Sequence, residues 1–136
     1  MSENEHEDEP LLASLRVLDL SDGNADGVTR LLADLGADVL KVEPPTGSAG
    51  RTELPTLDGV SIPFALHNAN KRSVVLDPAV PADRQVLLDL AGQADIVVDS
   101  GLPGSAGPLG LAGAYGTSCE ELADRFGHLV TMLVTD

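Results

Sequence analysis

Short apolar runs alternate with segments of helical spacing along almost the whole sequence, and this alternation constrains the fold more than any other feature. Strands are predicted at residues 15–20, 38–42, 72–76, 95–98 and 129–134. Helices are predicted at residues 26–35, within 62–70, from Pro81 onward and after a capping Thr117 or Ser118. This order predicts an α/β protein with a mainly parallel sheet covered by helices, because strands buried on both sides are almost continuously apolar.

The length of 136 residues allows one domain at most. Residues 1–10 (MSENEHEDEP) are acidic and contain no apolar run, so they are predicted to form a disordered, solubilising tail. Residues 11–136 are predicted to form the α/β domain.

The charge balance excludes several classes of function. The chain has 22 Asp and Glu residues against 8 Lys and Arg residues, a formal net charge of -14. Binding to nucleic acid or to an anionic membrane surface is disfavoured, because both need clustered basic charge. No apolar run approaches the ~20 residues that span a bilayer, and the pattern of a signal peptide is absent. With one cysteine, Cys119, the chain has no internal disulfide framework, so we expect a cytoplasmic protein with an unreactive thiol.

Two local patterns match known motifs only in part. Residues 22–27 (DGNADG) match the opening of an EF-hand calcium loop, but the twelfth position holds Ala33 in place of a bidentate Glu. We therefore expect a plain turn that starts a helix, and no metal site. Glycines recur at every third position from Gly101 to Gly116, which we interpret as a mobile loop, since the run is too short for a collagen triplet.

One positive cluster is a candidate binding site in this acidic chain. Lys71 and Arg72 follow Asn68 and Asn70 directly, just before a predicted strand. Cations with amide donors can hold phosphate oxygens or a nucleotide base, although an ordinary polar turn with two solvated cations is the alternative. Ligands of parallel sheets bind at the carboxyl ends of strands, so further candidate segments are the loops at 21–27, 43–59, 77–80 and 99–116.

Four stretches resemble, in this order and spacing, the N-terminal region of the family III CoA-transferases: LRVLDLS, TRLLADLGADVLKVEPP, NANKRSVVLD and LLDLAGQADIVV. The resemblance covers residues 11–134 and implies a Rossmann-like domain that holds coenzyme A, with helices on both faces of the sheet. It also implies that Asn70, Lys71 and Arg72 lie near the nucleotide and phosphates of CoA, and that Lys41 borders the same pocket.

The resemblance implies transfer of CoA between an acyl-CoA and a carboxylic acid, through a mixed anhydride on an aspartate. In the family this aspartate lies downstream of the strand that resembles residues 129–134, so we assign no catalytic residue. We expect the N-terminal, CoA-binding portion of such an enzyme, inactive alone, with a CoA thioester as its ligand.

Two departures from the family pattern leave a second hypothesis open. The loop at 22–28 lacks the family's Ala-Gly-Pro and carries Asp22 and Asp26, whose negative charge would weaken binding of a phosphorylated thioester. The strand that ends in the family as Val-Glu-Asn-Phe has VDSG at residues 98–101. The chain is alternatively a degenerate, non-catalytic domain that associates with a CoA-transferase-like partner.

Association is expected under either hypothesis. An apolar sheet face or edge left open would favour self-association or a second CoA-transferase-like chain. A third hypothesis, a calcium-responsive domain, rests on the match at residues 22–27 alone.

Overall fold

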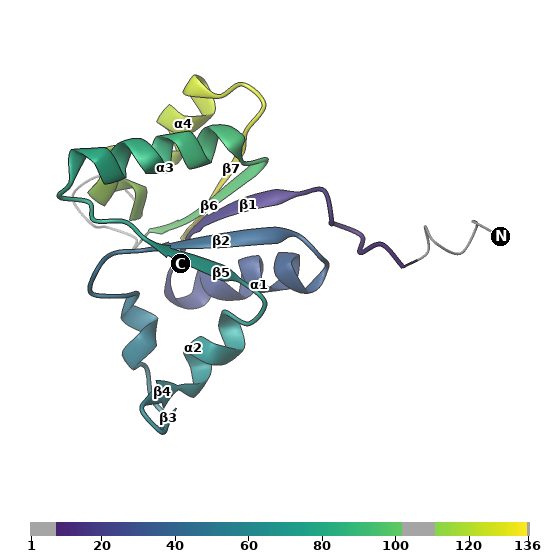
Figure 1. Ribbon diagram of the computed structural model, residues 1–136, viewed down its shortest axis with the longest axis vertical. Helices are drawn as coiled ribbons and strands as arrows, with labels where there is room; N and C mark the ends of the chain where they lie inside the picture. Colours follow the sequence, from purple (N-terminus) through teal and green to yellow (C-terminus); the bar gives the residue numbers. More distant parts are fainter. Residues whose placement is uncertain (1–7, 102–110, 136) are drawn as a thin grey trace.

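The computed structural model describes residues 8–101 and 111–135, with a five-stranded sheet at the centre (Figure 1). The strands are β1 (Arg16–Leu20), β2 (Asp38–Glu43), β5 (Arg72–Val75), β6 (Ile96–Gly101) and β7 (Val130–Thr135). Their order is β5-β2-β1-β6-β7, and every neighbouring pair runs parallel. The tail predicted at 1–10 and the loop predicted at 101–116 lie largely outside the described residues.

Helices cover both faces of this sheet. The α-helices are α1 (Asp26–Asp34), α2 (Ile62–His67), α3 (Pro81–Gln93) and α4 (Cys119–Arg125), and the 3-10 helices are η2 (Gly23–Ala25), η3 (Ala49–Thr52) and η4 (Leu111–Tyr115). Figure 1 shows α1 and α2 on one face and α3 and α4 on the other. The predicted α/β class with helices on both faces is therefore confirmed.

Neighbouring strand residues supply two separate cores, because successive side chains of a strand point to opposite faces of the sheet. Val17 and Val39 pack on the face that α1 covers. Leu18 and Val42 pack on the other face, with side chains from α3 and α4. Burial of one such side chain contributes about 1.5–3 kcal/mol, so the alternation strongly specifies which face each residue takes.

A short hairpin forms within and just after the segment 43–59, which we expected to be a loop. β3 (Thr56–Leu57) pairs antiparallel with β4 (Val60–Ser61) across Asp58 and Gly59. Both turn residues have positive φ, 52° and 80°, as a two-residue hairpin turn of type I′ requires. The Asp-Gly pair is the sequence signal that predicts this turn.

The strand order reverses at β1, and this reversal locates the candidate binding edge. The chain passes from β1 through β2 to β5 on one side, and through β6 to β7 on the other. Open parallel sheets bind ligands at the carboxyl ends of the strands that flank such a reversal, here β1 and β6.

No helix in the described part of the chain is long and apolar enough to cross a membrane. A cytoplasmic location stays a prediction.

Candidate functional site

The loops after β1 and β6 meet at the carboxyl edge of the sheet through Asp22 and Ser100. The backbone N–H of Asp22 donates to Ser100 Oγ at 2.9 Å. The Asp22 carboxylate accepts from the backbone N–H groups of Gly23 (2.9 Å), Ala49 (3.1 Å) and Gly50 (3.4 Å). Because Ala49 and Gly50 belong to η3, which follows β2, Asp22 joins the loops after three strands.

Asp26 begins α1 and turns its carboxylate into the protein, where the residue is buried. Its Oδ1 accepts from Lys41 Nζ at 2.8 Å, and its Oδ2 accepts from Asn68 Nδ2 at 3.0 Å. The expectation that Asp26 opposes a phosphorylated ligand is therefore wrong, because its charge is compensated inside the fold. The carboxylates of Asp22 and Asp26 already bind protein donors, which also argues against the EF-hand interpretation.

Lys41 lies on β2 with its side chain buried between the sheet and α1. Besides the Asp26 carboxylate, its Nζ contacts the carbonyl oxygen of Ser21 at 2.6 Å. The residue is therefore placed behind the loop after β1, not on the open edge.

Lys71 reaches the same interior from the turn before β5, and its side chain is also buried. Its Nζ donates to Asp19 Oδ2 at 2.9 Å, to Asn68 Oδ1 at 2.8 Å and to the Asp26 carbonyl at 3.0 Å. Burial lowers the pKa of Lys71, and the neighbouring negative charge of Asp19 opposes that shift.

Asp19 completes what we call the buried ion cluster, formed by Asp19, Asp26, Lys41 and Lys71. Its Oδ1 accepts from the backbone N–H of Ser21 at 2.8 Å and from the Ser21 hydroxyl. Its Oδ2 accepts from the Thr29 hydroxyl at 2.7 Å and from Lys71. Two carboxylates and two ammonium groups balance in charge, which buried ionic groups require.

The structure separates Asn70 and Arg72 from the buried ion cluster. Asn70 Nδ2 donates to Asp34 Oδ1 at 2.7 Å, at the end of α1. Arg72 forms two hydrogen bonds with the Asp38 carboxylate, at 2.9 and 2.8 Å, where β2 and β5 begin. The four residues that the resemblance assigns to CoA therefore lie in three places, with Lys41 and Lys71 together in the buried ion cluster, and their contact with CoA stays a prediction.

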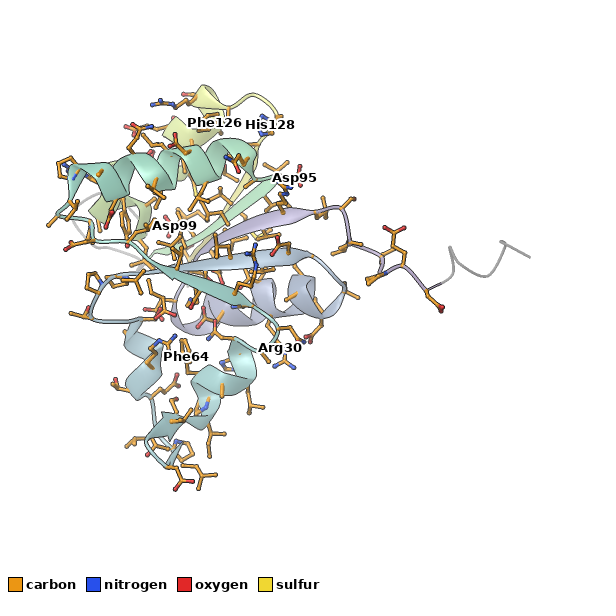
Figure 2. The ribbon with its side chains drawn as sticks, in the orientation of Figure 1. Arg30, Phe64, Asp95, Asp99, Phe126 and His128 are labelled. Carbon is orange, nitrogen blue, oxygen red and sulfur yellow. The ribbon has the colours of Figure 1, made fainter. Side chains whose placement is uncertain are left out.

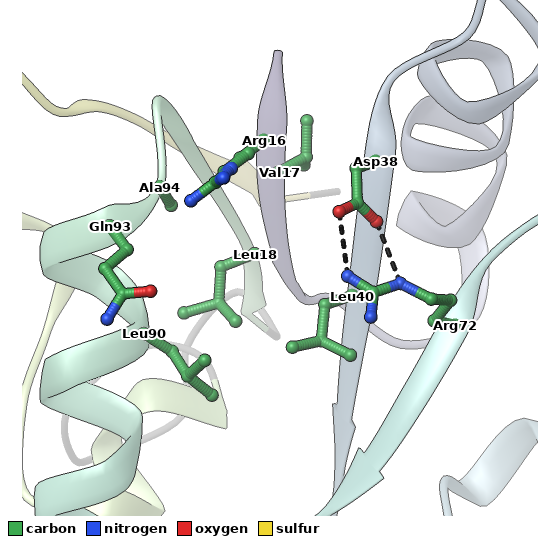
Figure 3. A pocket seen from close by; sticks show the side chains of 9 residues that line it. All are labelled: Arg16, Val17, Leu18, Asp38, Leu40, Arg72, Leu90, Gln93 and Ala94. Carbon is green, nitrogen blue, oxygen red and sulfur yellow. Dashed lines mark hydrogen bonds and ion pairs between the residues drawn. The ribbon is translucent and has the colours of Figure 1, made fainter. Parts of the chain in front are cut away.

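A cavity of about 280 Å³ lies at this amino end of the strands, between α3 and the sheet (Figure 3). Its lining includes the leucines Leu18, Leu40 and Leu90 and the polar residues Arg16, Arg72 and Gln93. Figure 3 shows the paired Arg72 and Asp38 on one side of it. The cavity lies at the opposite end of the strands from the loops that Asp22 joins.

Arg51 is a candidate binding residue that the sequence pattern did not single out. It lies on η3, and its Nε and Nη2 donate to the two carboxylate oxygens of Glu43 at 2.6 and 2.7 Å. Its guanidinium lies 4.5 Å from the ring centroid of Phe64, a residue of α2 that is labelled in Figure 2. The Arg51 hydrogen bonds lower the pKa of Glu43, so the pair stays ionised. Arg51 is the sole cation in the candidate loop 43–59, which is the signal that could have found it.

Two titratable groups near the carboxyl edge, the buried Asp99 and the half-buried Cys119, contact the protein backbone. Asp99, labelled in Figure 2, accepts from the backbone N–H groups of Ser100 (2.8 Å), Leu111 (2.8 Å) and Ala112 (3.1 Å), which holds η4 at the end of β6. Burial raises the pKa of Asp99. Burial and the charge of Asp99 raise the pKa of the Cys119 thiol to about 11, as expected for an unreactive thiol.

Comparison with known proteins identifies the family. The sequence profile of CoA-transferase family III matches residues 12–135. The chain belongs to CoA-transferase family III. It is 64% identical over 124 residues to the probable CoA-transferase Rv1866 of Mycobacterium tuberculosis. It is 38% identical over 101 residues to the formyl-CoA:oxalate CoA-transferase of Streptomyces avermitilis. These alignments cover 88% and 73% of the chain.

Solved structures of this family share the Rossmann-like fold. Rv3272 from M. tuberculosis matches 93% of the chain with a TM-score of 0.74 and 30% identity. A CAIB/BAIF family protein from Brucella suis matches 92% with a TM-score of 0.76 and 29% identity. The family III chain described here spans 34% and 33% of these two proteins, and 15% and 25% of the two curated relatives.

Proposed function

We propose that this chain is the N-terminal, CoA-binding portion of a family III CoA-transferase and that it is not active alone. The observation that supports this most is the joined carboxyl edge, where Asp22 and Ser100 connect the loops after β1 and β6. These loops flank the reversal of strand order, which is where open parallel sheets take ligands. The charge of Asp26 is paired with Lys41 inside the fold, so it does not oppose a phosphorylated ligand. The Asp22 carboxylate keeps its charge and is held by the backbone N–H groups of Gly23 and Ala49.

Candidate contacts for the CoA thioester come from two sources, the structure and the resemblance. Arg51 offers a half-exposed guanidinium, and guanidinium groups bind phosphate oxygens well. The resemblance adds Asn70, Lys71, Arg72 and Lys41 as predicted contacts. We favour Arg51 for the phosphates, since it lies on the same edge as Asp22 and the other four do not.

In the proposed reaction of a complete enzyme, an aspartate carboxylate attacks the thioester carbonyl, the C–S bond breaks and CoA leaves as the thiolate. The thiolate then attacks the aspartyl carbonyl of the anhydride, so the first carboxylic acid leaves and a thioester between the aspartate and CoA forms. A second carboxylate attacks this thioester and displaces the thiolate, which attacks the new anhydride at the carbonyl of the second acid, forms the product thioester and frees the aspartate. We assign none of these covalent steps to a residue of this chain, so its own part is binding and orientation of CoA.

Thermal unfolding of the chain with and without excess CoA tests the proposal. A ligand that binds only the folded state adds about 2.7 kcal/mol of stability at 100 times its Kd, which raises Tm by several degrees. Arg51→Met should reduce this shift, while Arg30→Met, which removes a partly exposed cation of α1, should leave it unchanged. A cooperative transition that CoA does not move contradicts the proposal.

A degenerate, non-catalytic domain that associates with a CoA-transferase-like partner is the second candidate. The observation that favours it is the edge strand β7, where Val130 is 60% and Met132 45% exposed. An open strand edge with apolar side chains favours pairing with another chain. Sedimentation velocity over a range of concentrations should then reveal self-association, and a compact monomer at every concentration contradicts it. Under this second candidate, restoration of Ala-Gly-Pro in the loop at 22–28 together with Ser100→Asn and Gly101→Phe should restore CoA binding to a chain that lacks it. No gain of binding would count against the loss of these two loops as the cause.

A further inference from the structure

We propose that Lys41 and Lys71 are positioning residues. Their buried ammonium groups hold the loop after β1 in the conformation that binds CoA. This inference rests on the proposed function, because the position of the loop matters for binding only if CoA uses this edge. It gives the two lysines a role other than direct contact with the ligand.

Lys41 holds both ends of the loop at residues 21–26. Its Nζ lies 2.6 Å from the carbonyl oxygen of Ser21, where the loop begins, and 2.8 Å from the carboxylate of Asp26, where α1 begins. The side chain is 2% exposed, so a ligand at the open edge has no access to this ammonium group.

Lys71 holds the same two loop ends by a second route. Its Nζ binds the Asp26 carbonyl at 3.0 Å and the Asp19 carboxylate at 2.9 Å. Asp19 in turn accepts the backbone N–H of Ser21 at 2.8 Å. Charged groups behind the loop therefore set the positions of Ser21 and Asp26.

The front of this loop is the proposed binding edge. Asp22, which follows Ser21 directly, carries the hydrogen bonds to Ser100 and to the backbone of Ala49 and Gly50. A displacement of Ser21 would therefore reach the loops after all three strands. Misplacement of donors by an ångström weakens ligand contacts strongly, because hydrogen bonds depend steeply on geometry.

A charge-balanced double variant separates positioning from stability. Removal of one ammonium group alone leaves a buried carboxylate unpaired, which destabilises the whole protein and hides any local effect. Asp26→Asn with Lys41→Met removes one charge of each sign and keeps the cluster neutral, but Ser21 still loses its charged donor. Asp19→Asn with Lys71→Met is the second balanced pair, to be used if the first does not fold.

The test measures amide hydrogen exchange of residues 21–26 without ligand, and the Kd for CoA by calorimetry, in the wild-type chain and the double variant. We expect exchange about tenfold faster and a Kd about tenfold weaker, the scale of one lost hydrogen bond to a charged group. Arg30→Met is the matched control, which removes a partly exposed cation of α1 outside the buried ion cluster and should change neither quantity.

Exchange as slow as in the wild-type chain would overturn the positioning role. An unchanged Kd beside faster exchange would overturn it as well, since the position of the loop would then not matter for CoA. A wild-type chain that binds no CoA contradicts the proposed function instead, and the exchange measurement still decides whether the lysines hold the loop.

Discussion

Two ion pairs of the same length lie toward opposite ends of β2 and differ in burial. Lys41 Nζ and Asp26 Oδ1 are 2.8 Å apart, and their side chains are 2% and 3% exposed. Arg72 Nη2 and Asp38 Oδ2 are also 2.8 Å apart, but their side chains are 68% and 46% exposed. If one partner of the buried pair is removed, the remaining charge is shielded from water, whereas the remaining charge of the exposed pair stays hydrated. The distance between the charged atoms therefore says little about the loss of stability when one partner is removed, and the burial of the pair says much more.

The largest effect is expected from loss of one partner in the buried ion cluster. Asp26→Ala leaves the Lys41 ammonium group without a counter-ion and removes an acceptor from Asn68, so we expect a loss of about 3–5 kcal/mol in the free energy of unfolding. Urea denaturation measures it. A loss below about 1 kcal/mol would show that Lys41 finds water or another partner, and the contrast with the exposed pair would fail.

An intermediate effect is expected at Glu43 and Arg51, a pair with one buried and one half-exposed partner. Because the pKa of Glu43 is lowered in the folded state, the pair stabilises the protein above the unfolded pKa of Glu and loses this contribution as the pH falls through the folded pKa. Glu43→Gln should cost about 1 kcal/mol or less at neutral pH, after allowance for solvent screening.

The pH dependence of this variant checks the assignment. Denaturation between pH 7 and pH 3 should show a smaller loss of stability on acidification for Glu43→Gln than for the wild-type chain. Parallel curves for the two proteins would mean that Glu43 contributes nothing to acid sensitivity.

The smallest effect is expected at the exposed pair. Arg72→Met should change the free energy of unfolding by about 0.2–1 kcal/mol, since exposed ion pairs contribute little and salt screens them. The same measurement in 1 M salt, at roughly a 3 Å screening length, should bring variant and wild type closer together. A loss as large as that of Asp26→Ala would remove burial as the explanation for the contrast.

The fold was largely predictable because its signals are local. The run at 15–20 predicts β1 at Arg16–Leu20, and the run at 129–134 predicts β7 at Val130–Thr135, each within one residue. Apolar spacing within a segment is enough for this, since one face of each helix is buried and the central strands β1, β2 and β6 are buried along much of their length. The β3–β4 hairpin was missed because only two residues form each strand, too few for an alternating pattern.

The candidate site was less predictable. Asn70, Lys71 and Arg72 are consecutive and were expected to act together, but Asn70 has a left-handed backbone, with φ of 67°. β5 begins two residues later, and successive side chains of an extended chain point to opposite sides. Lys71 therefore turns inward and Arg72 outward, a difference that no property of the two residue types predicts.

Local patterns along the sequence were enough to predict the fold class and the succession of the main strands and helices. They were also enough to recognise the resemblance to the family. The burial of Lys41 and Lys71 could not be predicted from the sequence, because their partners are distant along the chain. Lys41 and Asp26 are 15 residues apart, and Lys71 and Asp19 are 52 residues apart. Two lysines that composition would place in solvent are buried once β2 and the turn before β5 bring them against two aspartates. Burial of an ion depends on what the whole fold assembles around it, which is a property of the packed chain and not of any segment.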